Sequence, residues 1–367
     1  MSRPGILFIK HYSTNAKFIL NDRDILKKEY DVEVYTAYTK KNFLIVFSLL
    51  KQFFHLLFRV RRYKLYFIWF ADYHSFIPVL FAKLFGKRSV IAVGGYDATD
   101  IPEIDCGAFN ESTFKKRMRS FAVRFSLKNA DKILVVDDSL IENTNTYIYS
   151  DIPGKKDLKD GILNFVPELK NKIEIVYTGF DENFFKLNKD IPKESLVLSV
   201  GYSPNDNEFR RKGFDMLIKA AEIMKEVSFV IIGVNEEQLK YLSEINLNNV
   251  KFFTSVNMEE LIGYYSRAKV FAQLSLFEGQ PNSLCEAMMM QCIPVGSDVN
   301  GIPRVIGDTG FIVHKKSAEE ISEKILLALN SPLQKGALAR QRIIDNFSLV
   351  KRESKILSIV RDLLTKK

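Results

Sequence analysis

Short apolar runs alternate with amphipathic segments along the whole chain. The runs are rich in Val, Ile, Leu and Phe, a composition typical of strands buried in a parallel sheet. In the first half they cover residues 5–10, 31–35, 65–70, 89–93, 132–136 and 173–181. In the second half they cover residues 196–201, 229–232, 250–254, 269–274 and 292–296. Helical periodicity over residues 18–29, 111–130, 258–268 and 347–364 separates many of these runs. The alternation predicts an α/β fold.

Residues 40–64 differ from an ordinary amphipathic helix. Their polar residues form one narrow stripe at helical spacing: Ser48, Lys51, Gln52, His55, Arg59 and Arg62. Phe, Leu, Ile and Val occupy the rest of the circumference, which is more apolar surface than one face of a sheet can cover. Two interpretations stay open. The segment is either a crossover helix buried between the sheet and its neighbours, or a basic amphipathic helix that rests in lipid headgroups.

The composition favours a two-domain protein made and kept inside the cell. A chain of 367 residues with 47% apolar content is long for one domain and comfortable for two. Cys106, Cys285 and Cys292 have no metal-ligand spacing, so we expect a reducing cytoplasm and no metal site. The first apolar run is too short for a signal peptide, and no run approaches the roughly 20 residues of a membrane span.

The net charge of +9 is unevenly distributed. Residues 1–88 hold 16 Lys and Arg against 6 Asp and Glu, whereas the rest of the chain holds 37 against 38. One lobe therefore carries the whole positive excess, and a nucleic acid or a membrane surface could balance it. Because no nucleic-acid module or base-stacking platform is recognisable, we expect an anionic membrane surface rather than nucleic acid.

The stretch 277–290 combines two carboxylates with a turn and a helix. Glu278 should lie on the turn that leaves a strand, and Glu286 in the first turn of the next helix. That edge of a parallel sheet is where ligands bind, and a helix N-terminus capped by Asn282 or Ser283 would offer N–H groups to a phosphate. An alternative is structural: Ser283 and Glu286 also have the spacing of a capping box.

The longer pattern resembles the E-x7-E signature of the retaining glycosyltransferases of family 4. The matching residues are Glu278-Gly279, Pro281, Glu286-Ala287-Met288, Pro294-Val295 and Gly301-Ile302-Pro303. The resemblance implies a GT-B fold, in which two Rossmann-like domains face each other across a cleft and a C-terminal helix crosses back to the first domain. It predicts an acceptor domain at residues 1–188 plus the helix 350–367, a donor domain at 189–349, and a link near 187–195.

The resemblance also implies a reaction and a donor site. A hexose would pass from a nucleotide diphosphate sugar to an acceptor with retention, without a metal or other cofactor. Glu278 would position the sugar, Lys212 would stabilise the leaving diphosphate, and Glu286 would hold the ribose. The other donor-binding candidates are Arg210, Arg211, Thr254, Gly279, Gln280, Asn282, Ser283 and Leu284. Tyr202 stands where the family usually has an arginine, so Arg210 or Arg211 is the expected substitute.

In the first domain, His11, His74 and Asp97 follow predicted strands and are acceptor-binding candidates by the same resemblance. The family's usual glycine-rich first loop and its histidine near the fourth strand are absent, and Gly94-Gly95 stand in the place of the histidine. We expect a glycan or lipid-linked acceptor. With the basic first lobe, this places the protein peripherally on the inner face of the cell membrane.

Two other functions remain as alternatives. One is a different GT-B activity, such as a nucleotide-sugar epimerase, which lacks the E-x7-E pair in this setting. The other is a non-catalytic protein that binds a membrane or another polyanion on a GT-B scaffold. The chain has no G-x-G-x-x-G after a strand, no P-loop, no H-E-x-x-H and no serine-hydrolase elbow, which argues against the enzymes that use them.

Overall fold

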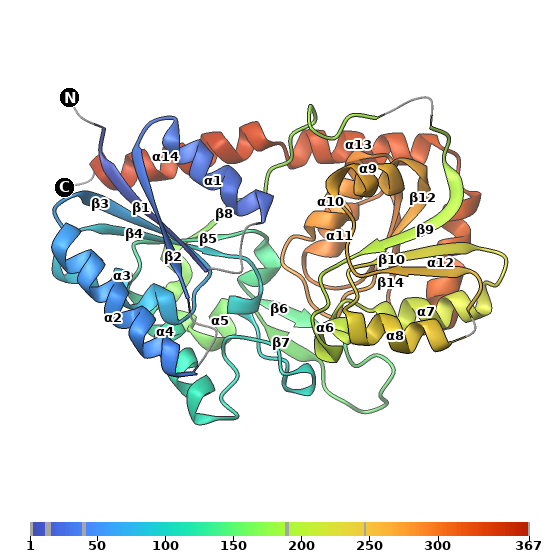
Figure 1. Cartoon of the computed structure of the whole chain (residues 1–367), viewed down its shortest axis with the longest axis horizontal. Coiled ribbons are helices and arrows are strands. Elements are labelled where there is room, and N and C mark those ends of the chain that lie inside the picture. Colours follow the sequence, from blue (N-terminus) through green and yellow to red (C-terminus); the bar gives the residue numbers. More distant parts are fainter. Residues whose placement is uncertain (1–2, 12–15, 39–41, 188–190, 246, 366–367) are drawn as a thin grey trace. The chain divides into compact units, whose positions relative to one another are not determined.

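The computed structural model describes residues 3–11, 16–38, 42–187, 191–245 and 247–365, which form two compact units (Figure 1). Unit 1 comprises residues 1–143, 160–179 and 349–367, and unit 2 comprises residues 144–159 and 180–348. The predicted boundary lay between residues 188 and 189, whereas contacts group residues 144–159 and 180–188 with unit 2. Residues 188–190 of the predicted link lie outside the described residues.

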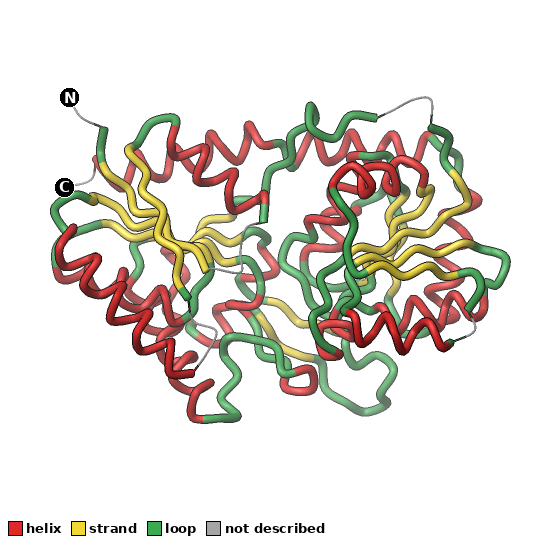
Figure 2. The backbone as a smooth tube through the Cα atoms, in the orientation of Figure 1, coloured by secondary structure: helices red, strands yellow, loops and turns green. Residues whose placement is uncertain are grey.

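Unit 1 is built on a parallel sheet with the strand order β2-β1-β3-β4-β5-β8 (Figure 2). Its strands are β1 (Gly5–His11), β2 (Asp31–Ala37), β3 (Tyr63–Trp69), β4 (Arg88–Val93), β5 (Lys132–Val135) and β8 (Ile173–Ile175). Its α-helices are α1 (Lys17–Lys27), α2 (Asn42–Arg59), α3 (Tyr73–Leu84), α4 (Phe114–Asn129), α5 (Ile162–Phe165) and α14 (Leu349–Thr365). Four short 3-10 helices lie in its connections: Tyr96–Ala98, Pro102–Ile104, Asp138–Leu140 and Pro167–Lys172. The central strands are buried apart from Lys64 and the strand ends His11 and Arg88, as their continuous apolar runs predict.

The last helix, α14, belongs to unit 1 and is fixed there by a buried ion pair. The Arg352 guanidinium donates to both carboxylate oxygens of Asp22 in α1, at 2.6 and 2.7 Å. Trp69 Nε1 donates to the same carboxylate at 2.9 Å, and Arg352 also donates to the carbonyl oxygens of Val176 and Tyr177. Buried charges are tolerated only when they are paired and hydrogen-bonded in this way. The predicted return of the C-terminal helix to the first domain is confirmed.

Unit 2 repeats the architecture with the strand order β11-β10-β9-β12-β13-β14, again parallel. Its strands are β9 (Glu194–Val200), β10 (Ser228–Ile232), β11 (Val250–Phe253), β12 (Ala268–Gln273), β13 (Ile293–Ser297) and β14 (Phe311–Val313). Its first helices are α6 (Asp206–Arg211), α7 (Phe214–Ile223), α8 (Glu236–Glu244) and α9 (Met258–Arg267). The later helices are α10 (Asn282–Met289), α11 (Gly301–Ile306), α12 (Ala318–Asn330) and α13 (Gln334–Asn346).

A short hairpin lies where the chain passes from unit 1 to unit 2 and back. It consists of β6 (Asn143–Asn145) and β7 (Leu158–Asp160), and residues 144–159 between and within these strands pack on unit 2. Tyr147 at its base is fully buried. We call residues 144–159 the arm. Asn145, Tyr147 and Ile148 of the arm are buried, whereas residues 150–157 are exposed, and so short a buried stretch gives no periodic signal in the sequence.

Helix α2 matches neither interpretation of residues 40–64 completely. Ile45 and Leu56 are buried, and Gln52 from the polar stripe is also buried, where its amide donates to the His74 carbonyl oxygen at 2.9 Å. Phe47 and Phe58 on the apolar circumference are 66% and 80% exposed. The interpretation of a wholly buried crossover helix is therefore wrong, because the sheet and α3 cover only one side. Within the described residues, no helix combines the length and apolar character needed to cross a bilayer.

Candidate active site

The centre of the candidate site in unit 2 is an ion pair between Lys212 and Glu278. Glu278 follows β12, in the loop that leads to α10, and Lys212 follows the short helix α6. The Lys212 ammonium donates to Glu278 Oε1, and each side chain is only 13% exposed. Both residues lie beyond the carboxyl ends of strands in the parallel sheet, which is the edge where α/β proteins bind ligands.

Further donors surround the Glu278 carboxylate. Ser275 Oγ donates to Oε1 at 3.0 Å, and the Gln273 amide lies 3.5 Å from the same oxygen. Arg211 contributes a second cation, with Nη1 at 3.5 Å from Oε1. Burial alone would raise the pKa of Glu278, but Lys212 and Arg211 outweigh it and hold this pKa below its ordinary value. The carboxylate is therefore ionised at neutral pH.

For Lys212, the effect of burial on the pKa outweighs that of the neighbouring charge. Burial lowers the pKa of its ammonium, and the charge of Glu278 only partly opposes this. The turn behind Lys212 requires glycine, because Gly213 has a φ of +70° and a Cβ there would lie 2.1 Å from the Leu274 carbonyl oxygen. Gly213 thus lets the Lys212 turn pack directly against the chain leaving β12.

The structure distinguishes the two arginines that could replace the arginine missing at Tyr202. Arg211 is turned into the site, where Nη1 donates to the Phe277 carbonyl oxygen at 3.0 Å and Nε donates to Glu208 at 2.7 Å. Arg210 is exposed, and Tyr202 is 78% exposed. Arg211 is consequently the cation that lies beside Lys212 and Glu278.

Helix α10 begins earlier than its sequence suggested. Its N-cap is Pro281, whose side chain cannot accept a hydrogen bond. Asn282 and Ser283 lie in the first turn. Both the predicted cap and the capping box are therefore wrong. Ser283 Oγ instead donates to Gln273 Oε1 at 3.1 Å. The first intrahelical bond joins the Cys285 N–H to the Pro281 carbonyl, so the N–H groups of Ser283 and Leu284 precede the hydrogen-bonded ladder.

Glu286 has a partner that the sequence did not indicate. The hydroxyl of Tyr265 in α9 donates to Glu286 Oε2 at 3.2 Å. Tyr265 is fully buried, and burial followed by the Glu286 charge raises the pKa of its phenol well above the ordinary value. Tyr265 therefore holds Glu286 as a neutral donor, and Glu286 does not cap α10.

The remaining donor candidates lie around the same edge of the sheet. Gly279 and Gln280 are buried in the loop between β12 and α10, and the Oδ1 atom of Asn282 is buried without a hydrogen-bond partner. Thr254 follows β11, the strand at one end of the sheet, and is half-buried. The predicted roles of all these residues stay predictions.

The arm fixes the loop that carries Glu278, a feature that sequence analysis missed. The buried Asn145 amide donates to the Leu276 carbonyl oxygen at 2.8 Å. The Leu276 N–H donates to the Arg211 carbonyl, and Ser297 Oγ donates to the Ser275 carbonyl at 2.7 Å. The backbone immediately before Glu278 is thus held on several sides. No local pattern could reveal a contact between residues 131 positions apart.

The acceptor candidates lie at the carboxyl edge of the sheet in unit 1. His11 ends β1, and its ring centroid is 6.0 Å from that of His74. Burial, with a further effect of His74, lowers the pKa of His11 to about 4, so this imidazole is neutral at physiological pH. His74, the second acceptor candidate, is only 1% exposed, and its Nε2 lies 3.0 Å from the Trp69 carbonyl oxygen. Residues 12–15 of the first loop lie outside the described residues.

Asp97 is fully buried. Its carboxylate accepts hydrogen bonds from the backbone N–H groups of Ala71, Gly94 and Gly95 at 2.9 to 3.0 Å. Burial raises the pKa of this carboxyl to about 6 despite these donors. Contact with an acceptor remains a prediction for Asp97, and the geometry favours a role in shaping the Gly94-Gly95 turn.

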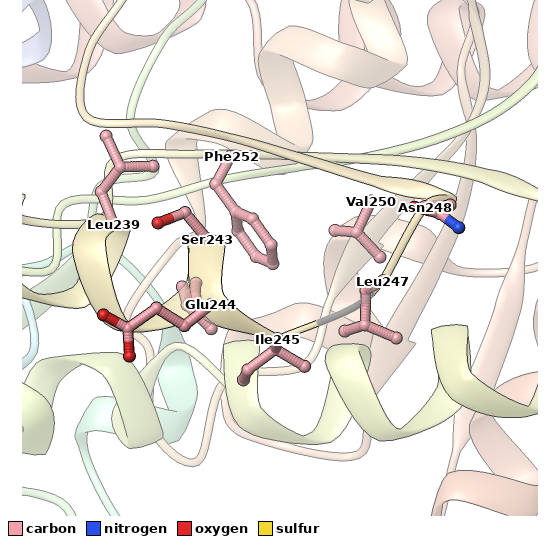
Figure 3. A pocket seen from close by; sticks show the side chains of 9 residues that line it. Leu239, Ser243, Glu244, Ile245, Leu247, Asn248, Val250 and Phe252 are labelled. Carbon is pink, nitrogen blue, oxygen red and sulfur yellow. The ribbon is translucent and has the colours of Figure 1, made fainter.

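A cavity elsewhere in unit 2 is separate from this site. It has a volume of about 480 Å³ and is lined by α8 and the start of β11, including Leu239, Leu242, Val250 and Phe252 (Figure 3). Val250 is the first residue of β11, so the cavity lies towards the amino end of a parallel strand. Glu278 and Lys212 lie at the opposite edge. No group of three or more His, Cys, Asp or Glu side chains suited to a metal occurs among the described residues.

Comparison with known proteins finds a family that matches much of unit 2. The family Glycosyl transferases group 1 matches residues 179–347, which include Lys212, Glu278 and Glu286. Over this segment, which is slightly less than half of the 367 residues, the chain is similar to the group 1 glycosyltransferases. The curated relatives include N-acetylgalactosamine-N,N'-diacetylbacillosaminyl-diphospho-undecaprenol 4-alpha-N-acetylgalactosaminyltransferase of Campylobacter jejuni, 26% identical over 63% of this chain. That match spans 58% of the relative's length. Trehalose synthase of Pyrococcus horikoshii is 32% identical over 31% of this chain and 29% of its own.

Solved structures of glycosyltransferases share the fold of this chain over nearly its full length. Sucrose-phosphate synthase from Thermosynechococcus elongatus superposes with a TM-score of 0.74 at 16% identity and covers 98% of this chain and 99% of its own. Anabaena HepE, solved with UDP and glucose, has a TM-score of 0.70 at 16% identity, over 97% and 99% of the two chains. At such identities the likeness concerns the fold, and the predicted GT-B fold is confirmed.

Proposed function

We propose that this protein is a group 1 glycosyltransferase, which moves a hexose from a nucleotide diphosphate sugar to an acceptor with retention at the anomeric carbon. The observation that carries the proposal is the buried Lys212–Glu278 pair beside Arg211 and the N-terminus of α10. Two cations and N–H groups at a helix start suit a diphosphate, and a carboxylate next to them suits sugar hydroxyls.

The chemistry follows from where charge develops. The bond between the anomeric carbon and the donor phosphate oxygen breaks, and a bond from the acceptor oxygen to that carbon forms on the same face. The acceptor proton passes to the leaving diphosphate. Lys212, Arg211 and the N–H groups of Ser283 and Leu284 stabilise the negative charge on that diphosphate. Glu278 orients the sugar, and Glu286, held by Tyr265, accepts hydrogen bonds from the ribose.

The proposed acceptor is a glycan or lipid-linked precursor at the inner face of the cell membrane. Support comes from the name of the Campylobacter relative, which acts on a diphospho-undecaprenol substrate, and from the charge of unit 1. Unit 1 holds 31 Lys and Arg against 20 Asp and Glu, whereas unit 2 holds 22 against 24.

Two measurements test the donor proposal. Nucleotide diphosphates should stabilise the protein against heat, by about 2.7 kcal/mol at ~100 times the dissociation constant. Screening UDP and GDP sugars for hydrolysis then identifies the donor. Glu278→Gln should reduce turnover at least ~100-fold at temperatures where the variant is folded. Glu323→Gln on the exposed surface of α12 is the matched control and should leave turnover unchanged.

Three results would contradict this function. A protein that no nucleotide stabilises would have the alternative role of a non-catalytic binder. An interconversion of free nucleotide sugars without transfer would indicate an epimerase. Near-normal transfer by Glu278→Gln would remove Glu278 from the sugar contacts.

A further inference from the structure

Three neighbouring helices of unit 1 carry an unusual surface. Helices α2, α3 and α4 pack side by side on one face of the sheet (Figure 1). Aromatic contacts connect them: the ring centroid of Phe53 in α2 lies 5.3 Å from that of Phe81 in α3, and Phe76 in α3 lies 6.1 Å from Phe121 in α4. We call the outer surface of α2, α4 and the end of α3 the docking face.

The docking face concentrates exposed phenylalanine. Seven of the eight phenylalanines that are exposed among the described residues lie on it. Phe47, Phe54 and Phe58 on α2 are 66%, 50% and 80% exposed, and Phe114 and Phe121 on α4 are 80% and 58% exposed. Single exposed apolar residues are ordinary, but several exposed aromatic side chains on neighbouring helices are typical of a surface that binds a partner.

The same helices lack negative charge. Helices α2, α3 and α4 together contain nine Lys and Arg and no Asp or Glu. Helices α7, α8, α9 and α12 of unit 2 each contain at least two carboxylates. Carboxylates of flanking segments pair with at least five of these nine cations, namely Arg59, Lys116, Arg119, Arg124 and Lys128. Unit 1 nevertheless keeps a net charge of +11.

We infer that the docking face binds an anionic lipid bilayer directly, with phenylalanines inserted among the acyl chains and cations against the headgroups. This inference deepens the proposed function and rests on it only for the identity of the acceptor. Apolar insertion and electrostatic attraction act together at such interfaces, which requires both features on one surface. A second copy of the chain fits less well, because a symmetric contact would bring the two sets of cations together. A nucleic acid would leave the phenylalanines hydrated.

Co-sedimentation with vesicles tests the inference on the full-length protein. Binding should rise as phosphatidylglycerol replaces phosphatidylcholine, and should fall at least fivefold between low and high salt. The double variant F54S/F58S should bind anionic vesicles at least tenfold more weakly. The matched control L326S/L327S removes two exposed leucines from α12 of unit 2, which are 51% and 45% exposed, and should bind like the unchanged protein.

Charge and apolar contributions are separated by a second variant. K51E/R117E changes one exposed cation on α2 and one on α4, and should remove the dependence on anionic lipid while leaving the fold unchanged. Stabilisation by nucleotide, measured without vesicles, should be the same in every variant. That readout concerns unit 2, so the donor proposal and the membrane inference fail independently.

Several outcomes would overturn the inference. One is an absence of binding to any vesicle, and another is binding that is indifferent to lipid charge and salt. Normal binding by F54S/F58S would show that these phenylalanines are not inserted. A dimer in solution that dissociates in F54S/F58S, together with no vesicle binding, would assign the face to a second copy of the chain.

Discussion

Removing the cation from the Lys212–Glu278 pair should destabilise unit 2, and the loss should be smaller when the charge of Glu278 is removed as well. Both side chains are only 13% exposed, so Lys212→Met leaves a buried carboxylate without its closest counter-charge. Breaking a buried pair from one side costs roughly 3–5 kcal/mol. In this variant Arg211 Nη1 at 3.5 Å and Ser275 Oγ at 3.0 Å still interact with the Glu278 carboxylate. We therefore expect a loss of stability at the lower limit of this range, about 3 kcal/mol. For a unit of this size that lowers Tm by roughly 6–12 °C.

The double variant makes the test specific. Lys212→Met combined with Glu278→Gln removes both charges, and the free energy of unfolding should recover by about 2 kcal/mol relative to Lys212→Met alone. Urea unfolding at pH 7, with the protein free of nucleotide, measures all four members of the cycle. Any loss caused by packing of the methionine is common to both variants and cancels in this comparison.

The pH dependence gives a second measurement on the same variants. The folded pKa of Glu278 lies below its ordinary value, so its contribution is present above about pH 4.5 and is lost as the pH falls. In Lys212→Met the buried carboxyl can instead protonate, so the gap in stability to the unchanged protein should narrow between pH 7 and pH 5. A cost below about 1 kcal/mol, or additive effects in the double variant, would refute a coupled buried pair.

Three other variants test separate contacts. Glu286→Gln should weaken nucleotide binding at least tenfold by calorimetry at unchanged Tm, and unaltered affinity would remove Glu286 from the ribose. Asn145→Leu should lower kcat several-fold with little change in the KM for donor, because the Leu276 carbonyl loses its amide donor. The control Asn249→Leu removes three similar hydrogen bonds to backbone carbonyls and should lower only stability. His11→Gln should flatten the loss of stability from pH 6.5 to 4, since a depressed imidazole pKa penalises the folded state there; an unchanged urea midpoint profile would contradict this.

Much of the fold could be predicted because buried parallel strands leave a local signal. The runs at residues 5–10 and 196–201 became β1 and β9 with small shifts at their ends. Glu278 was also placed correctly after β12, whereas Glu286 lies just beyond the first turn of α10, because that helix begins at Asn282. These features depend on neighbours in the sequence, which periodicity and spacing report well.

The predictions that were wrong or missing concern features that depend on backbone conformation and on contacts between residues far apart in the sequence. The start of α10 depends on the backbone conformation at Pro281, and a match to a capping box does not fix that conformation. Tyr265 and Asn145 act on Glu286 and Leu276 through tertiary contacts that leave no periodic trace. For α2, the sequence could not decide between burial and exposure, because the answer depends on how much of its circumference the sheet and α3 cover.

The pairing of Asp22 with Arg352 has a consequence for how the protein is made. The two residues are 330 positions apart, so at ~5–20 residues per second the ribosome needs roughly 16–66 s to produce the partner of Asp22. Throughout that interval the carboxylate beside Trp69 has no guanidinium to neutralise it, and the nascent first unit cannot close over it without cost. The arm likewise emerges 131 residues before Leu276, its partner. Unit 1 therefore cannot finish folding before α14 leaves the ribosome, and its native protection should appear only after that of unit 2, which is complete at residue 348.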